Sequence, residues 1–248
     1  MKSKLMKTLT LALAAVALVV VSVLGTMAYL TSSAAVANSF TIGNVGIQMY
    51  ESYVDQNGVK TDANPTGEGA RKTCAGNEYK LMPASSYVKD PTVYVNKGSS
   101  PSFLFIKVRN DIRSIEDSYS YTKNGETKSG TMRDQLLDNG FVQHHINDNV
   151  IVYVYGKLVD GVIEPTYVGN EEKDEVIDLF YGFKVKEGAD TAKFGGARVS
   201  LVAYAIQANG FEGNADAAWN QIVREYPYES GLTGTTPTTE AVTEPTTT

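Results

Sequence analysis

The amino terminus constrains this chain more than any other segment. Three lysines lie within the first seven residues, and residues 9–24 carry no charge. Small residues follow this apolar stretch at Thr26 and Ala28. A short cationic segment, an apolar helix and small residues, in that order, are typical of a signal peptide. We therefore expect a signal peptidase to cleave after Ala28, so that the mature chain begins at Tyr29.

An uncleaved membrane anchor is the alternative interpretation, because about 20 apolar residues can span a bilayer. The first charged residue after the lysines is Glu51. However, Thr26, Ser32 and Ser33 interrupt the apolar stretch, and no basic cluster follows it to stop transfer. We therefore interpret the mature chain as an exported protein, either secreted into the extracellular matrix or displayed at the cell surface.

The mature chain is acidic. Cleavage removes three of the 22 Lys and Arg residues and none of the 28 Asp and Glu residues, which leaves 19 basic residues, 28 acidic residues and a net charge of −9. A charge of this sign argues against nucleic acid as a partner, because DNA and RNA bind cationic surfaces. The single cysteine, Cys74, has no partner for an internal disulfide. Stability therefore depends on a hydrophobic core, for which residues 39–230 are long enough.

Alternating apolar residues predict β structure through most of this body. Residues 39–51 alternate but lose one step at residues 43–44, which predicts a β-bulge. Residues 102–108 place Phe103 and Phe105 on one face and further apolar residues on the other, as in a central strand covered on both sides. Further strands are expected at residues 91–96, 175–185 and 197–208.

Two hairpins are predicted from their turns, Asn124-Gly125 and Asp160-Gly161, because these residues tolerate the positive φ that tight turns need. The paired segments are residues 119–122 with 127–131 and residues 150–158 with 162–167. Helical spacing is found at Ala215–Val223, after Asn214, with one further turn at residues 132–137. Many strands, short polar turns and little helix favour a single jelly-roll-like β-sandwich of the all-β class.

We expect the chain to be organised in four segments. A signal helix occupies residues 1–28, and a mature N-terminal segment covers residues 29–38. The β-sandwich follows at residues 39–230. Residues 231–248 are rich in Thr, Pro and Glu, and they have too little apolar content to pack, which predicts a disordered tail.

Three blocks of sequence resemble one known family. Residues 25–31 (GTMAYLT) and 38–45 (NSFTIGNV) resemble the export signal and first strand of proteins that a SipW-type signal peptidase processes. Residues 89–99 (KDPTVYVNKGS) look like the second block of that family. Residues 203–208 (AYAIQA), followed by 217–219 (AAW), resemble its closing strand and helix. The family includes TasA, a biofilm fibre protein, and camelysin.

The resemblance implies a jelly-roll domain that a Gram-positive bacterium of Firmicutes type secretes and assembles into extracellular matrix fibres. It also implies a SipW-type signal peptidase as a partner during export. Because camelysin is described as a metalloendopeptidase, the family allows either a structural subunit or a secreted enzyme.

A metal site needs ligands that converge. A zinc hydrolase uses about three protein ligands on one metal, whereas the two histidines of this chain, His144 and His145, are adjacent. Adjacent residues point to opposite faces of a strand and cannot form the i, i+4 pair of an HExxH helix. Cys74 lies in a polar stretch where the spacing supplies no base to activate it. We therefore predict no catalytic residue, no metal and no cofactor.

The favoured hypothesis is a structural subunit of a biofilm-matrix fibre, with itself and other matrix or cell-wall proteins as partners. Assembly would use β-strand addition, in which an open sheet edge accepts the backbone of an extended segment. Tyr29–Ala37 is small and uncharged, with Tyr29, Leu30 and Val36 as its larger apolar residues, so we predict it to be the donated strand. A flexible N-terminus is the competing interpretation. A camelysin-like metalloendopeptidase and a surface adhesin domain are the alternative functions.

Overall fold

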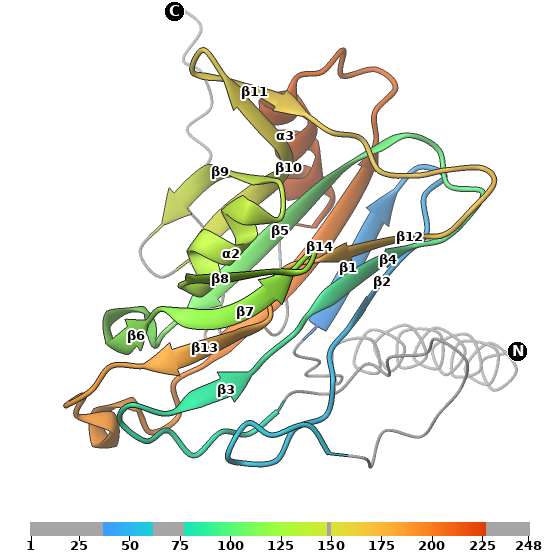
Figure 1. Ribbon diagram of the computed structural model, residues 1–248. Helices are drawn as coiled ribbons and strands as arrows, with labels where there is room; N and C mark the ends of the chain where they lie inside the picture. Colours follow the sequence, from blue (N-terminus) through green and yellow to red (C-terminus); the bar gives the residue numbers. More distant parts are fainter. Residues whose placement is uncertain (1–36, 62–76, 148–149, 227–248) are drawn as a thin grey trace, which may run out of the picture. The chain divides into compact units, whose positions relative to one another are not determined.

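The computed structural model describes residues 37–61, 77–147 and 150–226. Within these residues the chain is mostly β-strand, with two α-helices and two short 3-10 helices, which confirms the predicted all-β class. The strands form two packed layers (Figure 1). Among these residues, no helix has both the length and the apolar character that crossing a membrane requires.

The first layer is a six-stranded sheet in the order β1-β14-β5-β10-β11, with β9 also paired to β10. Its strands are β1 (Ala37–Ile42), β5 (Ser102–Asn110), β9 (Phe141–Asn147), β10 (Val150–Val159), β11 (Val162–Pro165) and β14 (Val199–Gln207). β1 runs parallel to β14, and the other pairs are antiparallel. β5 therefore lies inside the sheet, between β14 and β10.

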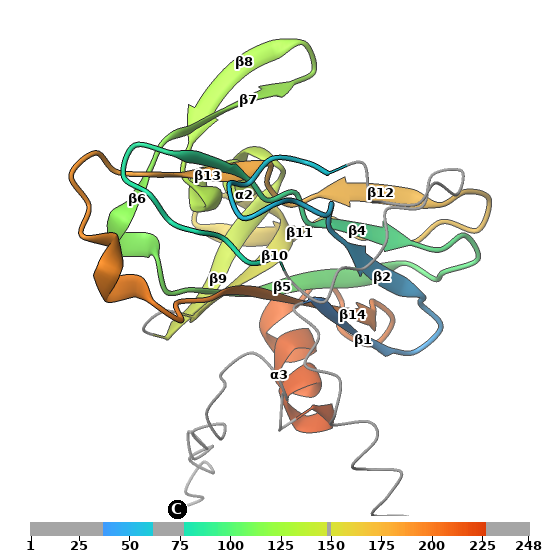
Figure 2. The same ribbon diagram turned by 90° about the horizontal axis from the view of Figure 1, so that it is seen from below.

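Both faces of this layer are covered. Leu104 and Ile106 of β5 face the core between the two layers, whereas Phe103 and Phe105 face a second cluster beneath helix α3 (Ala215–Glu225). Figure 2 shows α3 on the side of the sheet opposite the second layer. The predicted central strand with two buried faces is thereby confirmed.

The second layer contains two three-stranded sheets that continue one another. Their orders are β12-β4-β2 and β3-β13-β6. The strands are β2 (Ile47–Tyr50), β3 (Ser86–Val88), β4 (Thr92–Val95), β6 (Glu116–Asp117), β12 (Glu175–Asp178) and β13 (Gly182–Val185). Val88 pairs with Gly182 and Thr92 with Asp178, so the register is the same on both sides of the gap. The two sheets thus form one layer with an interrupted ladder.

The chain passes back and forth between the layers in the manner of a jelly roll. It runs from β1 in the first layer to β2–β4 in the second, back to β5, across to β6, then to β9–β11 in the first layer, β12 and β13 in the second, and β14 in the first. Two antiparallel strands stand apart as a hairpin, β7 (Tyr119–Lys123) and β8 (Glu126–Gly130). The predicted jelly-roll-like sandwich is therefore the observed architecture.

The structure corrects the prediction of one strand at residues 175–185. Leu179–Tyr181 interrupt it, because Pro91 lies opposite and has no N–H to donate to the ladder. Two hydrogen bonds bridge the gap, from Lys89 N to Tyr181 O at 3.3 Å and from Leu179 N to Pro91 O at 3.0 Å. β12 and β13 are the two halves of the predicted strand.

The predicted bulge at residues 43–44 is a corner between layers. Gly43 has a φ of +90°, which favours glycine, and the chain passes there from β1 in the first layer to β2 in the second. A single bulged strand is therefore the wrong description of residues 39–51. β1 also begins at Ala37, two residues before the expected start of the sandwich.

The turn and helix predictions are confirmed. Asn124 and Gly125 have φ values of 52° and 81°, and Asp160 and Gly161 have values of 50° and 81°. Helix α2 (Met132–Asp138) occupies the predicted turn and begins with a capping box in which Thr131 and Asp134 exchange hydrogen bonds. The remaining short helices are η1 (Arg113–Ile115) and η2 (Thr191–Phe194).

Helix α3 packs on a face of the first layer through Trp219. Its indole contacts Phe105 and Tyr204, with ring centroids 5.3 and 5.5 Å away. Because β1 extends the sheet beyond β14, residues 203–208 lie inside the layer, and Trp219 covers a face.

Candidate functional site

The residues that the sequence singled out for export and assembly lie outside the described part of the chain. These are Thr26, Ala28, Tyr29, Leu30 and Val36. The described part of the chain begins after them, at Ala37, which is the first residue of β1, an edge strand of the first layer. β1 has β14 on one side, and no other described strand pairs with it. Cys74 also lies outside the described residues.

A groove forms where β7 leaves the second layer. β6 pairs with β13, placing Asp117 opposite Lys184. Two residues further on, the Tyr119 ring lies so close to Gly182 that an added Cβ would be 2.5 Å from it. The next ring on that face, Tyr121, stacks on Tyr181 with centroids 5.1 Å apart. β7 then pairs only with β8 among the described strands, and the hairpin stands away from the layer (Figure 2).

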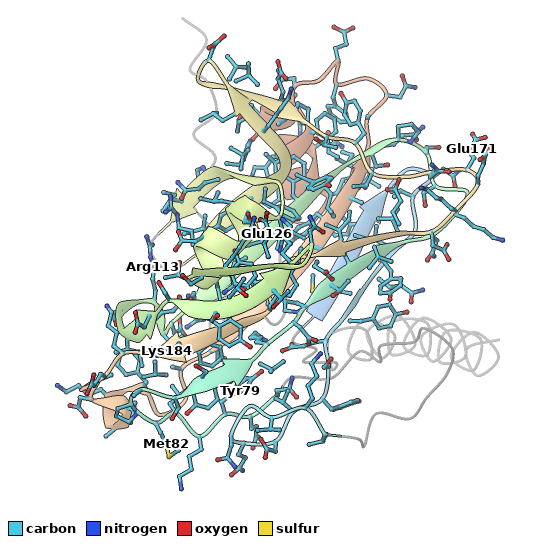
Figure 3. All side chains as sticks on the ribbon, in the orientation of Figure 1. Tyr79, Met82, Arg113, Glu126, Glu171 and Lys184 are labelled. Carbon is cyan, nitrogen blue, oxygen red and sulfur yellow. The ribbon has the colours of Figure 1, made fainter. Side chains whose placement is uncertain are left out.

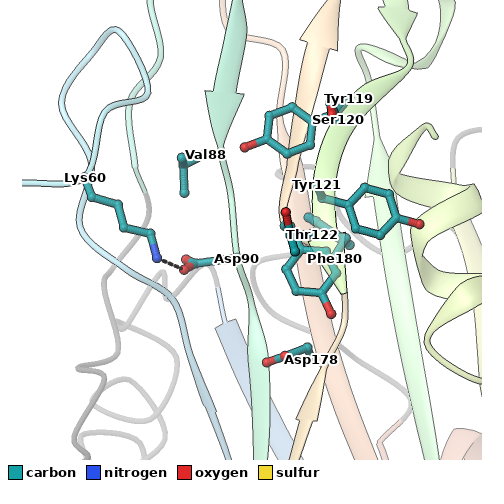
Figure 4. Close-up of a pocket in the computed structure, with 10 residues that line it drawn as sticks. Lys60, Val88, Asp90, Tyr119, Ser120, Tyr121, Thr122, Asp178 and Phe180 are labelled. Atoms are coloured by element: carbon teal, nitrogen blue, oxygen red, sulfur yellow. Dashed lines mark hydrogen bonds and ion pairs between the residues drawn. The ribbon is translucent and has the colours of Figure 1, made fainter. Parts of the chain in front are cut away.

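Two adjoining cavities make up this groove, with volumes of about 340 and 430 Å³. They share Thr122, Asp178 and Tyr181, so they form one continuous depression between β7 and β12. Figure 4 shows Lys60, Val88 and Asp90 on one side of the first cavity and Tyr119, Ser120 and Tyr121 on the other. We call this depression the β7–β12 groove.

The charged side chains that line the groove have hydrogen-bond or ion-pair partners. Lys60 Nζ lies 2.7 Å from Asp90 Oδ2, which also accepts a hydrogen bond from the Ser52 hydroxyl. Asp178 Oδ1 accepts a hydrogen bond from Thr92 Oγ1 at 3.0 Å. Burial raises the pKa of the Tyr119 and Tyr181 phenols, so both stay uncharged at neutral pH. The groove therefore presents aromatic rings and satisfied polar groups with little net charge.

Two amide side chains, Gln135 of α2 and Asn139 at the C-terminal cap of that helix, lie at the base of the groove, where the ladder is interrupted. Gln135, fully buried, accepts a hydrogen bond from Tyr181 N and donates to Gly182 O, both at 2.8 Å. Asn139 Nδ2 donates to Leu179 O at 3.0 Å. These amides take the place of a neighbouring strand along Leu179–Gly182, because buried backbone groups need partners.

A buried ion pair anchors the loops beside the groove. Lys89 Nζ and Glu51 Oε1 are 2.9 Å apart, and both side chains are almost completely buried. Asn77 and Tyr79 also donate hydrogen bonds to this carboxylate. Tyr79, labelled in Figure 3, lies beside β3 with its ring edge-on to Phe183. The pair thus joins the segment after β2 to the segment between β3 and β4.

The two histidines occupy different environments. The His144 side chain is 4% exposed and lies edge-on to Phe105, with Nε2 2.9 Å from Asp216 Oδ1. His145 is exposed. Burial lowers the pKa of His144, against the opposing effect of Asp216. Within residues 37–61, 77–147 and 150–226, no three His, Cys, Asp or Glu side chains are grouped as metal ligands.

Sequence reasoning missed the groove. The rings that line it come from β7 and from the segment between β12 and β13, which are far apart in the sequence. They come into contact because β7 first continues the register of β6 along β13 and then turns away from the second layer. The alternation of Tyr119 and Tyr121 in a short polar hairpin was a visible signal that one face of β7 is covered. The covering residue, Tyr181, was assigned to the middle of an unbroken strand.

Comparisons with known proteins leave the family of this chain open. No family model matches the chain, and no curated protein matches it. One similar solved structure is titled "Solution structure of CaCohA2 from Clostridium acetobutylicum". The match covers 67% of this chain and 94% of that chain, at 11% identity and a TM-score of 0.28. At these values it supports no inference about fold or function.

Proposed function

We propose that the mature chain is a secreted structural subunit of an extracellular fibre, in which copies join by β-strand addition. The observation that carries this proposal is the position of β1. The segment predicted to be donated, Tyr29–Ala37, ends at an edge strand of the first layer, because Ala37 is the first residue of β1 and pairs with Leu201, so residues 29–36 are the part left for donation. Edge strands present a row of backbone N–H and C=O groups that can pair with another chain.

Two features support a structural role over the peptidase alternative. His144 is buried against Phe105 while its neighbour His145 is exposed, so the two imidazoles are not presented to one metal. The described carboxylates nearest to the groove, Asp90 and Asp178, already accept hydrogen bonds from side chains. Neither arrangement resembles a water-activating centre.

The test is electron microscopy of the mature protein, residues 29–248, concentrated from dilute solution. We expect fibres from the wild type. Ala35→Pro removes a backbone donor from the donated segment and should leave a folded monomer. Thr239→Pro, in the C-terminal segment, is the matched control and should form fibres. A wild type that stays monomeric, or an Ala35→Pro variant that elongates normally, would contradict the proposal.

Secretion has its own test. Amino-terminal sequencing of protein from culture medium should give Tyr29 as the first residue. A membrane-bound product that retains Met1 would favour the anchor.

A further inference from the structure

We infer that the β7–β12 groove is the acceptor site for the strand donated by a second copy of this chain. The inference rests on the proposed function and adds where the added strand lies. Its occupant is the part of the predicted donor segment that precedes β1, residues 29–36 of the neighbouring copy, paired with the outer edge of β12.

The outer edge of the long ladder is covered everywhere except at β12. At β13 it is covered by β6, which pairs with Lys184 and Val185. Along Leu179–Gly182 it is covered by the amides of Gln135 and Asn139. β12 pairs with β4 on its inner side, and none of the described strands runs along its outer side. A strand added there would continue the layer.

The backbone of β12 is oriented to receive such a strand. Backbone groups of successive residues in a strand point in turn to one neighbouring strand and then to the other. Two hydrogen bonds show which residues point which way, because Asn96 N donates to Gly46 O and Leu179 N donates to Pro91 O. By that alternation, the N–H and C=O of Ile177 point to β4, and those of Val176 point into the groove. The Val176 side chain is 55% exposed, whereas that of Ile177 is 9% exposed. Val176 is therefore the residue whose backbone an added strand would engage first.

The chemistry of the groove disfavours an acidic occupant. Lys60 and Lys123, the two lysines that line it, are already paired with Asp90 and Asp138, so an acidic side chain would lose hydration without finding an unpaired cation. Tyr29–Ala37 has no charge and no proline. The C-terminal segment is less suitable, because it carries Glu240 and Glu244 together with two prolines that cannot donate hydrogen bonds.

The length of the donated segment is also adequate. Eight extended residues, 29–36, span about 26 Å, whereas β12 has four residues. Half of the segment can therefore pair with β12 while the rest follows the free side of β7. The amides of Gln135 and Asn139 mark the end of the available edge, which fixes the register of the added strand.

The sharpest test is Val176→Pro in the mature chain. This change removes the N–H that points into the groove and leaves the hydrogen bonds between β12 and β4 in place, as proline on an edge strand does. We expect an unchanged circular dichroism spectrum and fibre elongation slowed at least about tenfold. Val176→Thr keeps the N–H and the shape, so it should elongate like the wild type. A folded Val176→Pro variant that elongates normally would overturn the inference.

Cross-linking provides a second measurement that does not need the proline variant to fold. In a Cys74→Ser background, Val176→Cys is combined in turn with Leu30→Cys, Ser33→Cys or Val36→Cys. At least one pair should give a disulfide-linked ladder in oxidised fibres. Val162→Cys, at a site 65% exposed on β11, is the matched control and should give none. Equal ladders from both sites, or none from Val176→Cys, would place the added strand elsewhere.

The two proposals fail separately. If the wild type forms fibres but the groove variants behave like it, the groove is not the acceptor and strand addition uses another edge. If the wild type forms no fibres, a fluorescent peptide with the sequence of residues 29–37 still tests the groove. We expect this peptide to bind the mature protein and to lose at least about tenfold in affinity for Val176→Pro. A peptide that binds neither protein, or both equally, would exclude the groove.

Discussion

The two layers of this sandwich differ in the continuity of their strand pairing. In the first layer, β5 pairs along nine residues with β14 and is buried on both faces. In the second layer, the ladder is interrupted at Leu179–Tyr181, and the missing backbone partners are replaced by the side chains of Gln135 in α2 and Asn139 at its C-terminal cap. The first layer is held by continuous strand pairing and apolar packing, whereas the second relies on polar side chains at its interruption and leaves a strand edge beside a groove.

This comparison predicts that the second layer depends on buried polar groups. Lys89→Met leaves the Glu51 carboxylate buried without its cation. Removing one partner of a buried ion pair typically costs about 3–5 kcal/mol, and we expect the free energy of unfolding in urea to fall by that amount. The double variant Lys89→Met, Glu51→Leu should recover most of the loss. A single variant as stable as the wild type would show that the pair does not hold this layer.

The first layer, in contrast, should respond to the loss of apolar packing. Trp219→Ala removes the half-buried indole that contacts Phe105 and Tyr204, and we expect a cost of about 3 kcal/mol. Wild-type fluorescence should shift to longer wavelength on unfolding, because Trp219 is the single tryptophan. An emission maximum in the folded protein equal to that of the unfolded chain would contradict the packing.

The interruption itself can be probed through α2. Gln135→Leu leaves the N–H of Tyr181 and the C=O of Gly182 without these partners. We expect a loss of about 2 kcal/mol in unfolding free energy. Gln135→Glu keeps the acceptor for Tyr181 and loses the donor to Gly182, so its stability should be intermediate. If Gln135→Leu were neutral, the side chains of α2 would not be substituting for a strand.

The smallest expected effect concerns pH and the first layer. Burial lowers the pKa of His144 below its usual 6.5. Above pH 6.5 His144 is neutral in both the folded and the unfolded chain, so its titration does not change stability there. As the pH falls from 6.5 towards the lower folded pKa, the unfolded chain binds the proton first and stability is lost. Asp216 and His145 are the charged groups that act on this site.

Urea midpoints at about pH 7.5 and about pH 5.5 measure this effect. His144→Leu should show a smaller decrease between the two pH values than the wild type. His145→Leu, which changes an exposed residue, is the control and should behave like the wild type. A larger decrease in His144→Leu would show that Asp216 dominates over burial.

Much of the fold could be predicted from local pattern. The alternation in β5, the two turns with positive φ and the amphipathic α3 each depend on neighbouring residues, and all three were found from the sequence. The interruption at Leu179–Tyr181 could not be found in this way, because its cause, Pro91, lies on the opposite strand. Likewise, the corner at Gly43 looks like a bulge until the pairing partners of β1 and β2 are known.

The groove could not be predicted from the sequence for the same reason. Tyr121 and Tyr181 are far apart in the chain, and only the register between their strands brings them into contact. The predicted donor residues Tyr29, Leu30 and Val36 remain predictions, since they lie outside the described residues. The sequence shows that this segment is uncharged. The structure adds the outer edge of β12, beside the β7–β12 groove, as the place where we propose that it binds.

Hydrogen exchange at two adjacent residues tests the account most directly. In the mature monomer, the Val176 N–H points into the groove and should exchange fast, whereas the Ile177 N–H pairs with β4 and should be protected. In fibres, we expect Val176 to become protected at least about tenfold, with Ile177 protected in both states. Fibres in which Val176 exchanges as fast as in the monomer would contradict strand addition at β12.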